Sequence, residues 1–367
     1  MRKFFRIIII LLNIIAAVSL ILACLCCFIS PKVIWWISFF GLAYMYLLIF
    51  NICFIVFWAL SRKKVLMIIS LIPILFGWSF LGKHVQLFGK NISDEDKDRS
   101  IQLLSFNVQG FLQMNQKQSD GKKLNIFDFI KEKEPDIICF QEFVVHRWNK
   151  VFNEKNILTQ MEFTPYSHLE MHTRDDYGAG VATFSKYPII HEELIYSDNT
   201  INTCISSDLK IGADTVRVYN IHLKSVGFQN EEKELLDNVV KRDYGRKDLR
   251  TAKAIIRQLI TASFEREKQV KILSTHIGNS PYPVIICGDF NDPPTSYSYR
   301  KVRGNRKDAF IEAGSGRSTT FNIGRIASLR IDCILYSDVY KAYNYESPRV
   351  ILSDHYPVLS RLVKREK

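Results

Sequence analysis

The sequence predicts a mixed α+β fold in which two β-sheets pack together with helices outside, preceded by an apolar N-terminal segment. Short β-branched or aromatic runs dominate after residue 100 and alternate with loops. Helical patterns occur between them at irregular intervals, and no internal repeat is visible, which favours a layered sandwich. Residues 1–90 differ in composition, because they contain no Asp or Glu and consist mainly of apolar runs.

Residues 1–90 are predicted to be a membrane anchor that contacts the lipid bilayer. Three apolar runs cover 7–29, 33–60 and 65–81. A helix needs roughly 20 apolar residues to cross a bilayer, so the first two runs are long enough, whereas the third is shorter and contains Pro73. Tryptophans near the predicted ends fit an aromatic belt: Trp35, Trp36, Trp58 and Trp78.

A secretory signal peptide is the alternative for the first run. Arg2 and Lys3 open it with positive charge, and residues 21–24 resemble a bacterial lipoprotein cleavage site. The chain stays apolar after Cys24, however, where a processed protein would turn polar. This pattern favours an uncleaved span.

Basic residues predict the orientation of the anchor. They cluster before the first run and again at 62–64, between the second and third runs. Positive residues remain in the cytoplasm, so three spans place residues after 81 on the non-cytoplasmic side, whereas two spans leave them inside. We expect three spans, and hence a multi-pass integral protein of the bacterial inner (plasma) membrane with residues 91–367 on the non-cytoplasmic side.

The positive charge of the chain belongs mainly to this anchor. Nine of the 49 Lys and Arg residues lie in 1–90, which leaves 40 basic and 37 acidic residues in 91–367. A basic pI otherwise indicates nucleic-acid binding, so this distribution weakens the argument from overall charge. Residues 91–100 are polar and aperiodic and are predicted to be a linker. Residues 101–367 then form the second unit.

The second unit is predicted to contain mainly strands. The longest helical pattern covers 249–268, where Ala252, Ile255 and Ile256 have the spacing of one helix face. Further helices are predicted at 125–133 and 231–237. The predicted strands are 101–107, 137–142, 180–184, 204–210, 215–222, 284–287, 318–321, 331–336 and 358–362.

Polar residues recur where these predicted strands begin or end. Strand ends can meet at one rim of a sandwich, and carboxylate, amide and imidazole groups gathered there suit Mg²⁺, Mn²⁺ or Ca²⁺ better than zinc. Each residue alone also has a structural interpretation, such as a loop cap, a core histidine or a buried ion pair. Residues 288–294 alone could form a tight turn. The residues concerned are Asn107, Glu142, His222, Asp289, Asp332, Asp354 and His355.

Their order along the chain is more specific than any single residue. It resembles the endonuclease/exonuclease/phosphatase superfamily, which includes pancreatic deoxyribonuclease, abasic-site endonucleases, inositol polyphosphate 5-phosphatases and neutral sphingomyelinases. This resemblance implies a four-layered α/β/β/α sandwich and divalent-metal-dependent hydrolysis of phosphoesters. The segments that carry it are SFNVQ (105–109), QE (141–142), YGAGVATFSKYPI (177–189), NIHLKS (220–225), GDFND (288–292), RIDCIL (330–335) and SDHYPV (353–358).

The resemblance also implies a role for each site residue. Asp289 resembles the acid that orients or deprotonates the attacking water, and His355 resembles the imidazole at the scissile phosphate. The remaining roles are metal binding by Asn107 and Glu142, a phosphoryl hydrogen bond from Asn291, orientation of His355 by Asp332, a second imidazole at His222, and a metal-side or loop-fixing carboxylate at Asp354.

Three functions agree with these observations. The favoured one is a membrane-anchored, Mg²⁺-dependent phosphodiesterase acting on nucleic acid, with Mn²⁺ or Ca²⁺ as alternative ions. The second is the same chemistry on a lipid or small phosphorylated molecule, and the third is a catalytically silent, membrane-tethered binding module. Basic residues at 300–307 could contact a phosphate backbone or form a solvated loop. The sequence identifies no protein partner.

Overall fold

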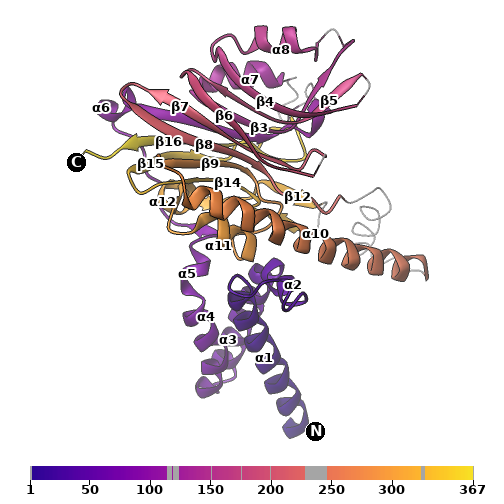
Figure 1. Ribbon diagram of the computed structural model, residues 1–367. Helices are drawn as coiled ribbons and strands as arrows, with labels where there is room; N and C mark the ends of the chain where they lie inside the picture. The colour runs from indigo at the N-terminus through magenta and orange to yellow at the C-terminus, as the bar shows by residue number, and fades with distance from the viewer. Residues whose placement is uncertain are drawn as a thin grey trace.

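Two six-stranded β-sheets lie face to face at the centre of the protein (Figure 1). The computed structural model describes residues 2–113, 118, 124–149, 151–174, 176–198, 200–227, 246–323 and 327–366. The first sheet has the order β15 (Tyr340–Glu346), β16 (Val358–Lys364), β2 (Ser100–Asn107), β3 (Ile137–His146), β5 (Tyr177–Ser185), β4 (Tyr166–Arg174). The second has the order β10 (Lys307–Asp308), β14 (Asp332–Tyr336), β9 (Val284–Asp289), β8 (Asp214–His222), β7 (Thr203–Ile211), β6 (Ile189–Ser197).

Alternation of side chains along the central strands produces three apolar layers. Leu103 points into the core between the two sheets, whereas its neighbour Leu104 packs against the outer helices. Helices α7 (Ile126–Lys133) and α8 (Glu154–Gln160) cover the first sheet, and α10 (Arg246–Gly278) and α11 (Tyr297–Arg303) cover the second. The predicted four-layered α/β/β/α sandwich is therefore confirmed.

Edge strands account for the main omissions of the strand prediction. The structure contains β4, β6 and β15, none of which was predicted, and all three lie at the edges of their sheets. Edge strands carry polar and half-exposed side chains and lack the apolar runs of central strands. The predicted strand at 318–321 is displaced, because β12 spans Phe321–Ile323. The predicted helix at 231–237 lies outside the described residues.

Short elements complete the fold. They are β1 (Val85–Gln86), which pairs with β11 (Gly316–Arg317), and β13 (Ala327–Leu329), which pairs with β12. Helix α6 (Asp94–Lys97) lies within the predicted linker, and α12 (Ala309–Ala313) follows β10. The 3-10 helices are η1 (Lys64–Met67) and η2 (Gln109–Phe111).

Pairing registers bring the strand ends to one rim of the sandwich. Strands β2 and β3 are parallel, with Asn107 opposite Gln141, and β8 and β9 are parallel, with His222 opposite Asp289. Antiparallel β14 begins opposite the end of β9, because Asp332 pairs with Asp289. The carboxyl ends of β2, β8 and β9, the middle of β3 and the start of β14 therefore meet at the same place.

Gly288 allows β9 to approach β8 closely before Asp289. Its φ is +148°, and a Cβ atom there would lie 2.0 Å from the Ile221 carbonyl oxygen. We expect Gly288→Ala to lower the free energy of unfolding by about 3 kcal/mol, because the backbone of β8 must move. Chemical denaturation measures this, with Gly212→Ala as control: Gly212 also has positive φ but no atom within 4 Å of a Cβ. Equal losses in both variants would contradict the steric explanation.

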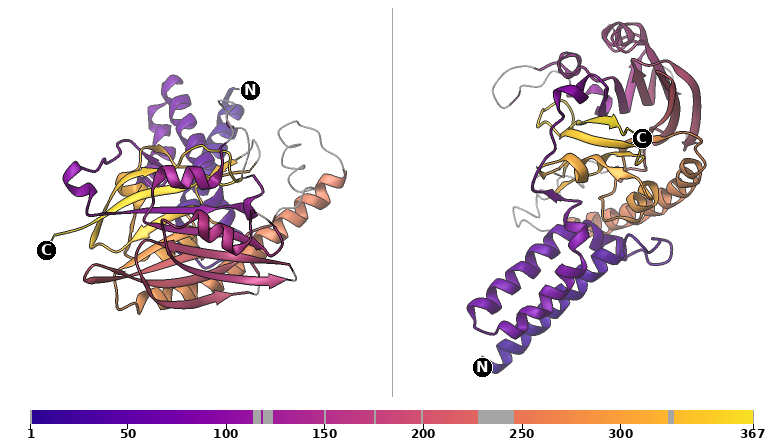
Figure 2. Two further views of the ribbon diagram at one scale, coloured as in Figure 1. Left: turned by 90° about the horizontal axis from the view of Figure 1, so that it is seen from above. Right: turned by 90° about the vertical axis from the view of Figure 1, so that its left-hand side faces the viewer.

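The N-terminal helices project from the side of the sandwich that carries α10 and α11 (Figures 1 and 2). Buried polar contacts join them, because Asn13 accepts a hydrogen bond from Trp58 Nε1 (2.8 Å) and donates one to Ser70 Oγ (2.6 Å). These contacts link three mainly apolar helices, α1 (Arg2–Leu25), α3 (Tyr44–Leu60) and α4 (Ile68–Phe76). The N-terminal group also includes α2 (Ile37–Leu42) and α5 (Trp78–Leu81).

The prediction of a multi-pass membrane protein is wrong. Among the described helices, only the segment Lys3–Leu25 is long and apolar enough to cross a bilayer. The run at 33–60 is divided by a break at Ala43, so its longer helix, Tyr44–Leu60, has only 17 residues. The third run is likewise interrupted at Gly77. The predicted inner-membrane topology placed the catalytic part of the chain on the non-cytoplasmic side. It required three spans and is therefore also wrong.

Candidate active site

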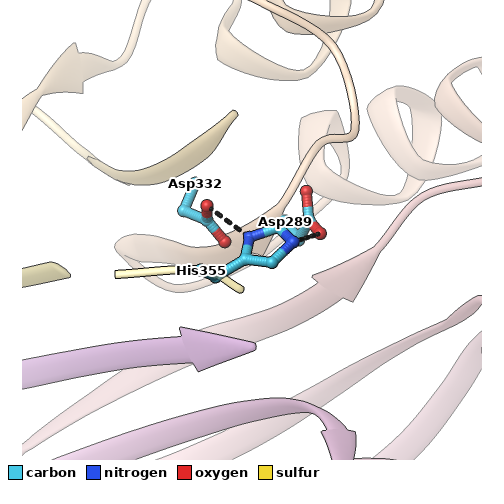
Figure 3. Close-up of side chains that lie close together, drawn as sticks. All are labelled: Asp289, Asp332 and His355. Carbon is cyan, nitrogen blue, oxygen red and sulfur yellow. Dashed lines mark hydrogen bonds and ion pairs between the residues drawn. The ribbon is translucent and has the colours of Figure 1, made fainter. Parts of the chain in front are cut away.

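Asp289, Asp332 and His355 converge at the rim of the sandwich (Figure 3). Asp289 ends β9, Asp332 begins β14, and His355 lies in the loop before β16. His355 Nδ1 lies 2.9 Å from Asp332 Oδ2, and His355 Nε2 lies 3.7 Å from Asp289 Oδ2. The imidazole is therefore held between two buried carboxylates from different strands.

This environment favours the protonated form of His355. Burial alone lowers the pKa of the imidazole, but the carboxylates of Asp332 and Asp289 outweigh it and raise the pKa to about 10. Asp332 is fixed in turn, because Thr320 Oγ1 accepts hydrogen bonds from the backbone N–H groups of Ile331 (3.0 Å) and Asp332 (3.1 Å). His355 can thus act as a cationic hydrogen-bond donor.

Asp289 experiences opposing influences. Burial and the nearby Asp332 carboxylate raise its pKa, whereas His355 and His222 lower it. Its Oδ1 accepts a hydrogen bond from the Asn291 backbone N–H (2.7 Å), and its Oδ2 accepts one from Asn107 Nδ2 (3.1 Å). Asp289 is therefore a positioned carboxylate whose proton affinity exceeds that of an ordinary aspartate.

A β-bulge directs Glu142 towards the same place. The register between β3 and β5 shifts between Gln141 and Phe143, and Glu142 has a positive φ of 50°. Bulges of this kind re-aim a side chain out of the regular alternation. Glu142 Oε1 accepts a hydrogen bond from Asn107 Nδ2 (3.2 Å), so Asn107 joins it to Asp289. The Glu142 side chain keeps 25% of its surface exposed, which leaves it accessible.

His222 presents an unpartnered nitrogen to these carboxylates. Its Nδ1 lies 2.8 Å from the Ile201 carbonyl oxygen, so Nδ1 carries the proton and donates it. Its Nε2 is buried and has no hydrogen-bond partner among the described residues. It lies 3.6 Å from Glu142 Oε1 and 3.8 Å from Asp289 Oδ2. In the neutral ring Nε2 is a free acceptor.

Asn291 and Asp354 lie beside this centre. Asn291 has a positive φ of 49°, and its Nδ2 donates to the Leu223 carbonyl oxygen (2.9 Å). Asp354 Oδ2 accepts a hydrogen bond from Gln109 Nε2 (2.8 Å), and the Gln109 backbone N–H donates to Asn107 Oδ1 (3.1 Å). Gln109 therefore connects Asp354 to Asn107.

Comparison with known protein families assigns the chain to one of them. Residues 104–355 match the Endonuclease/Exonuclease/phosphatase family. This chain belongs to that family. Membership makes it a phosphoesterase hydrolase. Residues 3–84 match a second family, described as a domain of unknown function (DUF8431). No curated protein matches the chain.

Several solved structures are similar to this family member. An endonuclease/exonuclease/phosphatase from Beutenbergia cavernae aligns with a TM-score of 0.52 and 14% identity, over 72% of each chain. A family protein from Leptotrichia buccalis has a TM-score of 0.46 and 17% identity, over 71% of this chain and 98% of its own. TDP2 of D. rerio, complexed with a single-strand DNA product, has a TM-score of 0.48 and 13% identity, over 72% of this chain and 98% of its own.

The donor set of this endonuclease/exonuclease/phosphatase family member fits a divalent cation. Glu142 and Asp289 offer carboxylate oxygens, which hard cations prefer, whereas the Asn107 amide turns its Nδ2 towards both carboxylates and its Oδ1 towards the Gln109 N–H. One ligand atom each of Asp289, Asp332 and His355 also lies within 4.8 Å of the others. We favour the oxygen donors, because a protonated His355 bonded to Asp332 offers no lone pair. The unpartnered buried Nε2 of His222 beside Glu142 is a further indication of a polar ligand.

The sequence prediction missed residues that support the site from behind. Asn220 Nδ2 donates across the core to the Phe140 (3.1 Å) and Ala182 (3.0 Å) carbonyl oxygens, and Gln141 Nε2 donates to Asn220 Oδ1 (2.8 Å). The buried network joins both sheets just behind the rim. Gln141 and Asn220 belong to the segments 141–142 and 220–225, which carry the family resemblance. A side-chain amide within an apolar strand indicates a buried hydrogen bond, and this signal could have identified both residues from the sequence.

Proposed function

We propose that this chain is a Mg²⁺-dependent phosphodiesterase in which Asp289 and His355 act at the reacting phosphate. The observation that supports this most is the buried His355 between Asp332 and Asp289. A phosphodiester is anionic and repels a nucleophile, so the site must offset negative charge and orient water. A cationic imidazole beside a carboxylate of raised pKa combines a phosphate ligand with a proton acceptor.

Glu142 and Asn107 would hold the cation, with Asp289 at its edge. Mg²⁺ is proposed, and Mn²⁺ or Ca²⁺ suits the same oxygen donors. When bound, the ion polarises a phosphoryl oxygen and offsets the charge that develops there. Asp354 lies next to Asn107 through Gln109, and the Asn107 amide would turn its Oδ1 towards the ion when the ion binds.

The protein residues then perform the hydrolysis. Asp289 orients a water molecule in line with the leaving oxygen and accepts its proton as the bond to phosphorus forms. His355, held by Asp332, donates a hydrogen bond to the phosphoryl oxygen, and Asn291 adds a neutral donor. His222 contributes the second imidazole. The bond from phosphorus to the leaving oxygen breaks, the leaving oxygen takes up a proton from solvent, and the products are a phosphomonoester and an alcohol.

Helix α1 is proposed as the membrane anchor. The segment Lys3–Leu25 has 23 residues, which is enough to cross the roughly 30 Å hydrocarbon layer. Its apolar composition and low burial support contact with lipid. The proposed units remain an anchor at 1–90, a linker at 91–100 and a catalytic unit at 101–367.

Two substrate classes are proposed, nucleic acid and a phosphoester presented at a membrane. The basic stretch 300–307 gives little support to nucleic acid, because Arg300 stacks on Phe28 (4.3 Å) and Lys307 pairs with Asp338 (2.9 Å). A membrane substrate is favoured by the loop after Asp289, which rests on the N-terminal helices. Thr295 Oγ1 donates to the Gly41 carbonyl oxygen (2.9 Å). A silent binding module would not need this complete set of site residues.

An assay of the full chain in detergent tests the proposed reaction. Plasmid DNA, RNA, sphingomyelin and inositol phosphates are each incubated with Mg²⁺, and parallel samples contain EDTA. We expect EDTA to abolish hydrolysis and excess Mg²⁺ to restore it, because the oxygen donors hold the ion reversibly. Equal rates with and without EDTA would refute metal dependence. Hydrolysis of none of the substrates would refute the proposed substrate classes.

The pairing of Asp332 with His355 predicts a pH effect. Removal of the Asp332 charge lowers the pKa of His355, so the imidazole loses its proton at lower pH. We expect Asp332→Asn to lower kcat and to move the alkaline limb of its pH profile towards neutrality. Asp198→Asn, a change at a partly exposed carboxylate that pairs with Lys224, is the control. An unshifted alkaline limb in Asp332→Asn would contradict a role in holding the proton.

A further inference from the structure

A cavity separates the N-terminal helices from the sandwich behind the catalytic loop. Its volume is about 260 Å³. Pro293, two residues after Asn291, forms part of its wall, but none of the proposed catalytic or metal-binding residues lines it. The helices contribute mainly apolar side chains, and the sandwich contributes mainly polar ones. Its lining includes Tyr44, Met45 and Ile49 on the first side and Arg317, Thr319 and Arg330 on the second.

The polar side of this cavity is electropositive. His84 stacks on Tyr44 with ring centroids 5.1 Å apart, and its buried Nε2 has no hydrogen-bond partner among the described residues. Burial, followed by the charges of Arg330, Lys83 and Arg317, lowers the pKa of His84 to about 3. A neutral imidazole thus lies among three cations, in a position that suits an anion.

Arg317 is the cation that remains available there. Arg330 is already occupied, because its guanidinium pairs with Asp308 and donates to the Lys83 carbonyl oxygen (3.0 Å). Arg317 is exposed, and its side chain makes no ion pair or hydrogen bond within the described part of the chain. A guanidinium has a planar set of donors that matches phosphate oxygens.

An apolar stripe leads away from the other side of the cavity along α3. Ile49 lines the cavity, and Ile52, Val56 and Leu60 follow at the spacing of one helix face. All four are exposed, by 46–80% of their surface. The stripe extends about 16 Å at the helical rise of 1.5 Å per residue. Helix α3 lies beside α1, the proposed anchor, so lipid chains around α1 would reach it (Figures 1 and 2).

We propose that this cavity binds the phosphate headgroup of an anionic membrane phospholipid, whose acyl chains lie along the stripe of α3. Arg317 binds the phosphate, and the neutral His84 ring offers a further hydrogen bond. The lipid remains bound between the helices and the sandwich and does not react. This inference rests on the proposed anchoring through α1, but it is independent of the proposed hydrolysis.

Binding of a labelled lipid tests the site directly. Phosphatidylglycerol with a fluorescent acyl chain is titrated with the full chain in a neutral detergent that contains EDTA, and the dissociation constant is measured by anisotropy. The Asp289→Asn variant is used throughout, so that the probe is not hydrolysed. Diacylglycerol with the same label has no phosphate, and unlabelled glycerol 3-phosphate is a competitor without chains.

We expect Arg317→Gln to weaken binding of phosphatidylglycerol at least about tenfold, because a charged hydrogen bond is lost. Ile49→Gln should also weaken it, and Lys341→Gln, an exposed change on β15, should not. Diacylglycerol should bind at least about tenfold more weakly than phosphatidylglycerol.

Two outcomes would overturn the proposal. The first is equal binding of both lipids, or no effect of Arg317→Gln, which would show that no phosphate is recognised. The second is displacement of the lipid by an equal concentration of glycerol 3-phosphate, which would show that the occupant is a free phosphate compound. Lipid binding together with absent hydrolysis in the wild-type chain would refute the proposed reaction alone.

Discussion

Replacement of Asp289 by asparagine is expected to lower kcat by roughly 10²- to 10⁴-fold, the contribution of a positioned general base. Asparagine keeps an oxygen that can accept the Asn291 backbone hydrogen bond but cannot take a proton from water. The wild-type carboxylate is buried near the like charge of Asp332, which repels it, and near the His355 imidazole, which attracts it. Loss of the Asp289 charge removes both the repulsion and the attraction, and their effects on stability are opposite. The variant should therefore fold normally.

Kinetics with Mg²⁺ and thermal unfolding together test this prediction. The melting temperature should stay within about 4 °C of the wild-type value, a shift of roughly 1 kcal/mol for a domain of this size. Asp214→Asn is the matched control, because Asp214 is an exposed carboxylate paired with Lys364 at the surface. His355→Ala should also lose most activity, and near-wild-type turnover in either site variant would exclude the proposed mechanism.

Replacement of Arg330 by methionine is expected to lower the free energy of unfolding by about 3–5 kcal/mol. Arg330 and Asp308 form a fully buried ion pair, in which the Asp308 carboxylate also accepts hydrogen bonds from Tyr299 and the α12 backbone. Burial alone raises the pKa of Asp308, but Arg330 outweighs it and holds the pKa below its usual value. Without Arg330 a buried charge is left uncompensated.

Denaturant titration at several pH values measures the effect and its sign. Because the folded-state pKa of Asp308 is lowered, its contribution to stability is present above the unfolded pKa of about 4 and is lost as the pH falls through the lowered value. In Arg330→Met the pKa of Asp308 rises, so at low pH the carboxylate is protonated and no buried charge is left uncompensated. The difference between the free energies of unfolding of wild type and variant should therefore become smaller as the pH falls.

Two further variants distinguish the effect of breaking the buried ion pair from the effect of removing a charge at the surface. Arg330→Met combined with Asp308→Asn removes the uncompensated charge and should recover part of the stability. Arg365→Met breaks a surface pair with Asp338 and should cost no more than about 1 kcal/mol. If Arg330→Met cost as little as Arg365→Met, the buried pair would contribute nothing to folding.

The central strands were predictable because local composition and burial agree there. β2, β8 and β9 are buried on both faces, so each is read as an apolar run that ends in a polar residue. The edge strand β6 has mostly exposed or half-exposed side chains, so its sequence carries no such run. Similarly, an apolar count could not reveal that the run at 33–60 divides at Ala43, because the break depends on local helix geometry.

The layered α+β fold, the apolar N-terminal segment and the order of residues that indicates phosphoester hydrolysis could all be inferred from the amino-acid sequence. Those features are local or ordered along the chain. The proton on His355, the buried pair of Arg330 with Asp308 and the cavity beside Arg317 become apparent only once the chain is folded. Each of these depends on burial and on charges that act through space between residues distant in the sequence. The reduced screening of the protein interior makes such contacts strong, and only the fold brings them within range.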